Sequence, residues 1–158
     1  MVTPDEYLIL EQKAEFKSEY WNGEMRPVAL STPRHSELST IFAALAIARL
    51  KGKNCGAFNS DLRVRDSEDG LYTYPDISIV CGPPEFGKAY TLSNPTVLVE
   101  VLSPSTEGWD RGFKFERYQH LESLREYVLI SQEKPRVETY LRQPDGSCAT
   151  KPSTASTL

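Results

Sequence analysis

The sequence lacks the features that mark membrane, secreted or zinc-cluster proteins. Its 158 residues contain no apolar run near the ~20 residues that cross a bilayer, and the N-terminus has no basic-then-apolar signal pattern. The three cysteines, Cys55, Cys81 and Cys148, lie far apart without a C-x-x-C pair. They fit neither a disulfide framework nor a zinc cluster, so we expect buried, reduced thiols in a cytoplasmic protein with no membrane partner.

Motifs for nucleotide cofactors and nucleophilic triads are also missing. The absence of a P-loop and of G-x-G-x-x-G argues against a nucleotide cofactor. With His35 and His120 as the two histidines and no Ser or Cys elbow, a triad has little support. Gly and Pro, at 9 and 11 residues, are too few for a collagen-like or linker sequence. Length and ordinary composition predict one globular domain.

Basic residues are outnumbered, with 18 Lys and Arg against 22 Asp and Glu, a net charge of −4. Such a balance argues weakly against a nucleic-acid binder, because affinity for phosphates comes mainly from Lys and Arg. The distribution changes this interpretation. Residues 31–65 hold six bases and two acids, residues 66–110 hold one base and eight acids, and residues 111–158 hold eight bases and six acids. An acidic centre between basic flanks suits a cation surrounded by phosphates.

Local signals in the first third of the chain predict two helices and a hairpin. Residues 3–6 (TPDE) form a capping box that starts a helix ending near residue 15. Asn22-Gly23 predicts a hairpin turn within residues 18–28. Thr32-Pro33 opens a second helix, which we expect to end at Gly52.

The remaining periodicity predicts strands and one more helix. We expect strands at residues 55–65, 74–80, 96–102, 126–131 and 136–141, and a helix at 109–121. This order predicts an α/β (α+β) layer sandwich around a central mixed sheet, with residues 1–146 as one domain. Residues 147–158 hold six Ser or Thr, so we expect a disordered tail and no partner strand after the turn at 144–146.

Two carboxylates interrupt apolar strands and are the main candidates for chemistry. Asp76 opens one strand and Glu100 stands inside the next. A buried carboxylate is costly unless it is paired, hydrogen-bonded or bound to a metal, so pairing with Arg or Lys is the structural alternative. Lys114 follows on the third helix, where an ordinary pair with Asp110 is the alternative. Glu19 in the hairpin is weaker, because it can be an exposed acid facing Arg26 or Lys17.

Other residues are secondary candidates for substrate contacts. His35 begins the second helix, where it is either a capping or exposed residue or a phosphate contact. Arg63 and Arg111 belong to the basic flanks that would meet phosphates. Tyr118 lies on one helix face with Lys114, although a core role is the commoner one for a tyrosine.

Several of these residues carry a resemblance to a known family. The segments SEYWNGE, YPDISIV, PTVLVEVLSPST and REYVLI, with D-x-x-x-K-x-x-x-Y between the last two, resemble the Uma-type putative restriction endonuclease family. The family is part of the PD-(D/E)XK, restriction-endonuclease-like nucleases, and the resemblance covers about residues 3–146. Leu102 stands where the usual motif has lysine. The family continues beyond this chain's end with further strands, so we expect a truncated or divergent C-terminus.

The resemblance implies a restriction-endonuclease-like core and a role for each candidate. Asp76 and Glu100 would be metal ligands, Lys114 the catalytic lysine moved onto the following helix, and Glu19 an auxiliary acid. Mg²⁺ or Mn²⁺ would bind the two carboxylates and the carbonyl of Val101, since Mg²⁺ prefers oxygen ligands and keeps several waters. The expected function is a metal-dependent endonuclease acting on DNA, with a homodimer suited to double-strand cutting.

Two other functions stay open at this point. A truncated nuclease fold could be catalytically inactive and bind DNA or a protein partner instead. A glycosidase could use Asp76 and Glu100 as its carboxylate pair, but such sites usually add aromatic stacking and lack the lysine.

Overall fold

A computed structural model describes residues 1–151, which fold into helices and strands in nearly the predicted order. In chain order the elements are α1 (Pro4–Lys13), β1 (Ser18–Trp21), β2 (Glu24–Pro27), α2 (Pro33–Leu50), β3 (Cys55–Asn59), β4 (Val64–Arg65), β5 (Tyr72–Thr73), β6 (Ile77–Cys81), the 3₁₀ turn η1 (Lys88–Tyr90), β7 (Val97–Leu102), α3 (Glu107–Trp109), the π turn η2 (Asp110–Lys114), α4 (Phe115–Tyr118), β8 (Glu126–Ser131), β9 (Val137–Arg142) and β10 (Cys148–Lys151).

The local signals near the N-terminus act as predicted. Thr3 and Glu6 form the capping box of α1. Asn22 and Gly23 turn the β1–β2 hairpin with positive φ angles of 47° and 85°. The Thr32 hydroxyl caps α2 by accepting a hydrogen bond from the His35 backbone. The hairpin and both helix starts are therefore set by sequence local to them.

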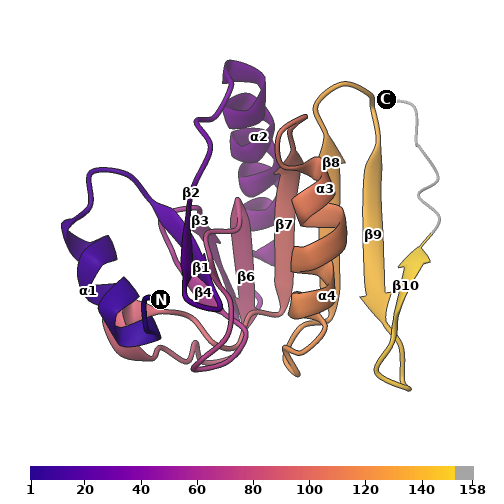
Figure 1. The fold of residues 1–158 in the computed structure, drawn as a ribbon. Helices are drawn as coiled ribbons and strands as arrows, with labels where there is room; N and C mark the ends of the chain where they lie inside the picture. The colour runs from indigo at the N-terminus through magenta and orange to yellow at the C-terminus, as the bar shows by residue number, and fades with distance from the viewer. Residues whose placement is uncertain (152–158) are drawn as a thin grey trace.

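A six-stranded mixed sheet forms the centre of the molecule (Figure 1). Its order is β10-β9-β8-β7-β6-β3, and β7 and β8 are parallel whereas the other neighbours are antiparallel. The α/β sandwich around a mixed sheet is thus confirmed. The parallel pair needs a crossover, and α3, η2 and α4 supply it.

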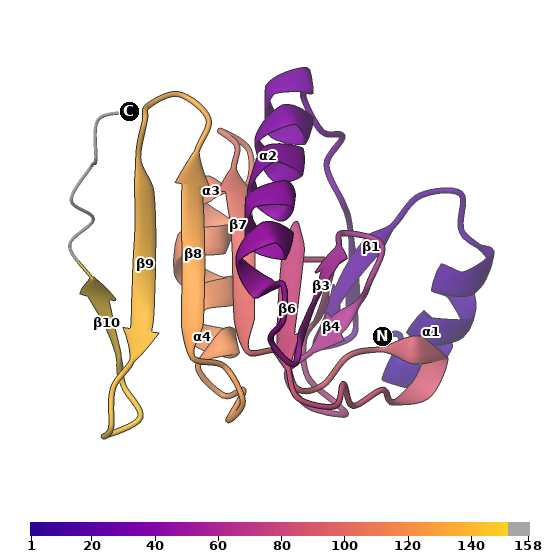
Figure 2. The same ribbon diagram turned by 180° about the vertical axis from the view of Figure 1, so that it is seen from behind.

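Residue alternation along the strands decides which helix covers which face. In β7, Val99 and Val101 point to the face where α2 packs, and Leu98 and Leu102 point to the opposite core. The two sides are visible in Figures 1 and 2, where the α3–α4 segment covers one face and α2 the other. Glu100 has the same parity as Leu98 and Leu102, so it faces the α3–α4 side.

A second, four-stranded antiparallel sheet of order β2-β1-β5-β4 lies next to α1. Its core is an aromatic cluster of Tyr7, Tyr20 and Tyr72, whose ring centroids are 5.0 to 5.9 Å apart. The single strand predicted at 55–65 is wrong, because β3 and β4 belong to different sheets. Asn59 breaks the strand, since its side chain accepts a hydrogen bond from the Asp61 backbone and turns the chain.

The third helix also differs from the prediction of residues 109–121. It begins at Glu107, contains the π turn η2 over 110–114 and ends at Tyr118. Helical periodicity alone cannot show a π turn, because this one spans only Asp110–Lys114 and is too short to set a period of its own.

The prediction of buried, reduced thiols is wrong for Cys55 and Cys81, and Cys148 is reduced but not buried. Cys55 and Cys81 are cross-strand partners on β3 and β6 and form a disulfide, and Cys81 is exposed. Sequence spacing could not show this, because strand register brings together residues 26 positions apart. Cys148 is a free, partly exposed thiol.

The prediction that no strand follows the last turn is also wrong. Cys148–Lys151 forms β10, which pairs with β9 antiparallel after Gly146 turns the chain. The rest of the expected disordered tail, residues 152–158, lies outside the described residues. Within residues 1–151, no helix has the length and apolarity needed to cross a membrane.

Candidate functional site

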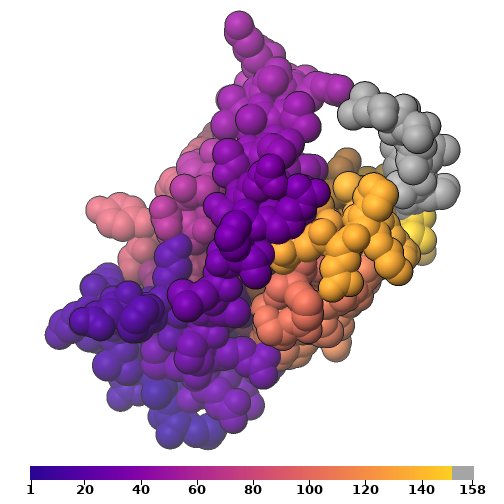
Figure 3. All heavy atoms as spheres, turned by 90° about the horizontal axis from the view of Figure 1, so that it is seen from above, coloured from indigo at the N-terminus to yellow at the C-terminus, as the bar shows by residue number. Residues whose placement is uncertain are grey.

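A cavity of about 700 Å³ is lined by residues from both sheets and from the N-terminal ends of α2 and the α3–α4 segment. Asp76, Glu100, Lys114, Glu19 and Val101 all line it. In Figure 3 the purple atoms of the β2–α2 region lie beside the orange atoms of the C-terminal half, the two parts of the chain that supply most of the lining. Five candidates from four separate parts of the chain therefore share one cavity.

Strand register places Asp76 beside Glu100. The ladder between β6 and β7 pairs Ile77 with Val99, so the next position along sets Asp76 opposite Glu100. The Asp76 carboxylate is fixed there because Oδ2 accepts a hydrogen bond from the Val101 backbone N–H at 2.7 Å. The two acids are thus held on neighbouring strands by backbone geometry.

Lys114 lies at the centre of a buried cluster of acids. Its Nζ is 2.8 Å from Glu19 Oε1, 3.1 Å from Glu100 Oε1 and 3.2 Å from Asp110 Oδ1. Its side chain is 6% exposed, and the three carboxylates are 9%, 5% and 3% exposed. The pair with Asp110 is therefore present, but as part of a buried network and not as an exposed i, i+4 pair.

The electrostatics of this cluster are set by burial and by excess negative charge. Burial raises the pKa of Glu100 well above its ordinary value; Lys114 opposes this, and Asp110, Asp76 and Glu19 add to it. Burial likewise raises the pKa of Asp110. Burial alone would lower the pKa of Lys114, but the neighbouring carboxylates raise it well above its ordinary value. Lys114 therefore stays charged at neutral pH. Its single positive charge does not balance the three carboxylates around it.

Glu19 reaches the cluster from the other sheet. One oxygen accepts from Lys114, and the other accepts a hydrogen bond from the Trp109 indole N–H at 3.1 Å. The exposed hairpin position considered above is wrong, since Glu19 is buried and pairs with neither Arg26 nor Lys17. The sequence does not indicate that Trp109 belongs to the cavity, because its partner Glu19 lies 90 residues away.

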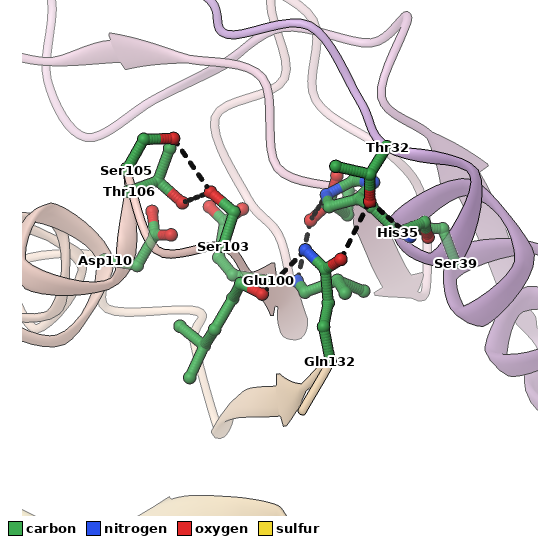
Figure 4. A network of polar contacts seen from close by, with 12 residues as sticks. Thr32, His35, Ser39, Glu100, Ser103, Ser105, Thr106, Asp110 and Gln132 are labelled. Carbon is green, nitrogen blue, oxygen red and sulfur yellow. Dashed lines mark hydrogen bonds and ion pairs between the residues drawn. The ribbon is translucent and has the colours of Figure 1, made fainter. Parts of the chain in front are cut away.

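The His35 side chain contacts Asp76 and is mostly buried, with 15% of its surface exposed. Its Nε2 lies 3.1 Å from Asp76 Oδ2, and this hydrogen bond raises the pKa of His35 although its partial burial opposes the shift. The first turn of α2 is anchored by Thr32, which donates to Gln132 Oε1 while Gln132 Nε2 donates to the Leu102 carbonyl (Figure 4). Gln132 thus connects α2 to the end of β7.

The serine-rich loop after β7 lines the cavity on the side opposite His35. Ser103 shares hydrogen bonds with Ser105 and Thr106, at 3.1 and 2.8 Å, next to Asp110 (Figure 4). These hydrogen bonds within the loop shape the turn into the following helix. The helical spacing of Asp110 from Lys114 predicts an ordinary ion pair, and this spacing is the one sequence signal that places Asp110 near the cavity.

Three predicted substrate contacts lie outside the cavity lining. Arg63 is buried, and its guanidinium donates to Thr91, Tyr74 and the Ala89 carbonyl. Arg111 pairs with Glu107 and Glu138.

Tyr118 lies beneath the cavity. Its hydroxyl donates to Glu100 Oε1 at 3.2 Å and lies 2.6 Å from Thr73 Oγ1, so it supports the Glu100 carboxylate.

The lining residues meet the needs of a hard divalent cation in part. Within residues 1–151, no group of three or more His, Cys, Asp or Glu side chains is arranged as a metal site. Asp76 and Glu100 each use one oxygen for the hydrogen bonds above, and among the described residues no hydrogen bond reaches Asp76 Oδ1 or Glu100 Oε2. Two carboxylates with water completing the shell suit Mg²⁺, and a cation would relieve the excess negative charge.

Comparison with known proteins identifies a family and two relatives for this chain. The family model Uma2, described as a putative restriction endonuclease, matches residues 4–157. Two uncharacterized proteins of Synechocystis sp., slr1290 and sll1609, are 35% identical over 145 residues and 34% identical over 147 residues. The matches cover 92% of this chain in both cases, and 76% and 83% of the relatives.

A solved structure shares the fold over the whole chain. It is the crystal structure of a putative nuclease belonging to DUF820 from Anabaena variabilis, with a TM-score of 0.75 and 21% identity. The match covers 100% of this chain and 88% of that one. The restriction-endonuclease-like fold class and the family resemblance noted in the sequence are both confirmed.

Proposed function

Because this chain belongs to the Uma2 putative restriction endonuclease family, we propose that it is a Mg²⁺- or Mn²⁺-dependent endonuclease that hydrolyses phosphodiester bonds in DNA. One observation carries the proposal: Asp76 and Glu100, on neighbouring strands, and Lys114, on the following helix, line one cavity. The spacing of these residues along the chain does not require such a convergence, so it supports a shared role.

Each residue has a part that its contacts support. Asp76, Glu100 and the carbonyl of Val101 would hold the cation. A bound Mg²⁺ neutralises charge on a scissile phosphate and makes a bound water more acidic. Lys114 keeps its proton, so it stabilises negative charge and does not act as a base. Glu19 accepts from Lys114 and orients its ammonium group.

The proposal is tested on supercoiled plasmid DNA with Mg²⁺ or Mn²⁺ added. We expect nicked or linear products from the native protein and a loss of at least about 100-fold in rate for Asp76→Asn and Lys114→Ala, the size typical of removing one charge-stabilising group. Asp76→Asn is the sharper variant, because an amide oxygen can still accept the Val101 hydrogen bond. Linear product in the first round would indicate two paired sites and hence a homodimer. Cleavage that persists in Asp76→Asn contradicts the site assignment.

A non-catalytic remnant that binds DNA or a protein partner is the competing function. Calorimetric titration with Mn²⁺ separates the two, because a remnant has no need of a metal site. We expect binding in the native protein and loss of binding in Glu100→Ala. Heat changes that are identical in both proteins favour the remnant.

A further inference from the structure

We propose that Arg26 binds a backbone phosphate of the DNA substrate at the rim of the cavity, with its guanidinium held ready by the Trp109 ring. This inference rests on the proposed function and adds a substrate-contact residue to it. Arg26 lines the cavity, is exposed, and was considered from sequence as a counter-ion for Glu19. The contacts of Glu19 and Trp109 give it a different role.

Strand register directs Arg26 to the site. Arg26 on β2 is the cross-strand partner of Glu19 on β1, so both side chains project from the same face of the hairpin. Glu19 points into the acidic cluster, where Lys114 and Trp109 use both of its oxygens. Arg26 therefore lies beside the cluster, but the Glu19 carboxylate is already paired and does not form an ion pair with it.

The Trp109 ring supports Arg26 and is not free for other stacking. The Arg26 Cζ atom lies 4.2 Å from the ring centroid, and the Phe113 ring stacks at 4.2 Å with an interplanar angle of 20°. Two groups this close to one ring must occupy opposite faces, so no face remains for a nucleotide base. A guanidinium held against an indole loses less freedom when it binds a ligand, which favours a pre-positioned phosphate contact.

The charge balance of the cavity gives Arg26 its function. Among the cavity-lining cations, Lys114 pairs with three carboxylates and Lys17 pairs with Asp61 at 2.6 Å. Arg26 makes no ion pair within residues 1–151. A DNA strand that approaches this acidic cavity is repelled unless cations meet its phosphates, and Arg26 is the cavity-lining side chain with unused positive charge.

The planar guanidinium selects the ligand class. Its parallel N–H groups match the oxygens of a phosphate in a two-point contact, and Arg26 is exposed at the cavity, where a phosphate can reach it. Such a contact fixes the strand without reading its sequence.

The experiment measures binding of a fluorescent DNA duplex by anisotropy at several salt concentrations, with Ca²⁺ present and a gel to show that the duplex stays intact. Arg26→Ala is expected to weaken binding about tenfold and to reduce the slope of log affinity against log salt by about one ion. Arg26→Lys should retain the slope and lose part of the affinity. Arg49→Ala, an exposed arginine of α2 outside the cavity lining, is the matched control and should change neither.

A second variant separates the two roles of Trp109. Trp109→Phe keeps a ring beneath Arg26, so we expect an unchanged salt slope. It removes the indole N–H that donates a hydrogen bond to Glu19, so we expect slower plasmid cleavage. If the native protein binds the duplex and Arg26→Ala binds with the same affinity and slope, the inference is wrong while the proposed function stands. If the native protein neither binds nor cuts DNA, the proposed function fails first.

Discussion

At the scale of single residues, Lys114 is the side chain on which the site depends. It is almost fully buried, and its ammonium group is the shared counter-charge for Glu19, Glu100 and Asp110. Burying charges is unfavourable unless each is paired, so removing one member leaves the others uncompensated. The same residue thus has a structural role and the proposed catalytic role.

Lys114→Ala is therefore expected to lower stability as well as activity. Its loss leaves three buried carboxylates without a cation, and breaking a buried pair in this way costs about 3–5 kcal/mol. Urea unfolding of both proteins at neutral pH measures the change. Lys17→Ala is the matched control, because its pair with Asp61 is largely exposed and exposed pairs contribute about 0–1 kcal/mol. A difference below about 1 kcal/mol for Lys114→Ala would show that the cluster is not a stabilising network.

Sequence patterns single out three of the side chains that line the cavity. Asp76 and Glu100 stand out because they are charged within apolar strands, and Lys114 follows at helical spacing from Asp110. Trp109 and Arg26 do not stand out, since both are ordinary residues for their elements. Their positions depend on the hairpin packing against the α3–α4 segment, which no local pattern encodes.

At the scale of elements, the predictions succeed where one segment determines its own structure. The capping box of α1, the Asn22-Gly23 turn and the Thr32 cap of α2 all use contacts within a few residues. The errors fall where tertiary pairing decides the outcome. The segment 55–65 divides between two sheets, and β10 exists because β9 offers a partner edge.

The cross-strand pair of Cys55 and Cys81 gives a prediction at this scale. Because the bond joins β3 to β6 across a separation of 26 residues, it restricts the unfolded chain and should stabilise the fold by about 2–4 kcal/mol. Thiol titration of unfolded, non-reduced protein should count one free cysteine, Cys148, and three after reduction. Cys55→Ala should unfold at the same urea concentration with and without reductant. Three free thiols before reduction would contradict the pairing.

At the scale of the whole molecule, the distribution of charge matters more than its sum. The net charge of −4 combines an acidic cavity with basic segments before and after it. Much of the rest of the interior is apolar and aromatic, and several tyrosines bury hydroxyl groups in it. Tyr7 donates to the Ser18 carbonyl at 2.6 Å, and Tyr127 donates to the Asp110 carbonyl at 2.9 Å.

Because of these buried tyrosines, we expect the folded protein to lose stability at alkaline pH. Burial raises the pKa of Tyr7, Tyr72 and Tyr127 above the ordinary value of 10.0. The unfolded chain therefore ionises first as pH rises, and the folded state, which keeps the neutral phenols, is progressively disfavoured above pH ~10. Below pH ~10 both states hold their protons, so this contribution to stability is fully present there.

Tyr7→Phe isolates one part of this effect. At neutral pH the variant should be about 1 kcal/mol less stable, because the hydrogen bond to Ser18 is lost. Above pH ~10 the difference should shrink, since phenylalanine has no proton to lose in either state. Urea unfolding at intervals from neutral pH to above pH ~10 measures both proteins, and absorbance titration of the tyrosines follows their ionisation. A stability gap that stays constant above pH ~10 would mean that Tyr7 ionises equally easily in the folded and unfolded chain, contrary to its burial against Tyr20 and Tyr72.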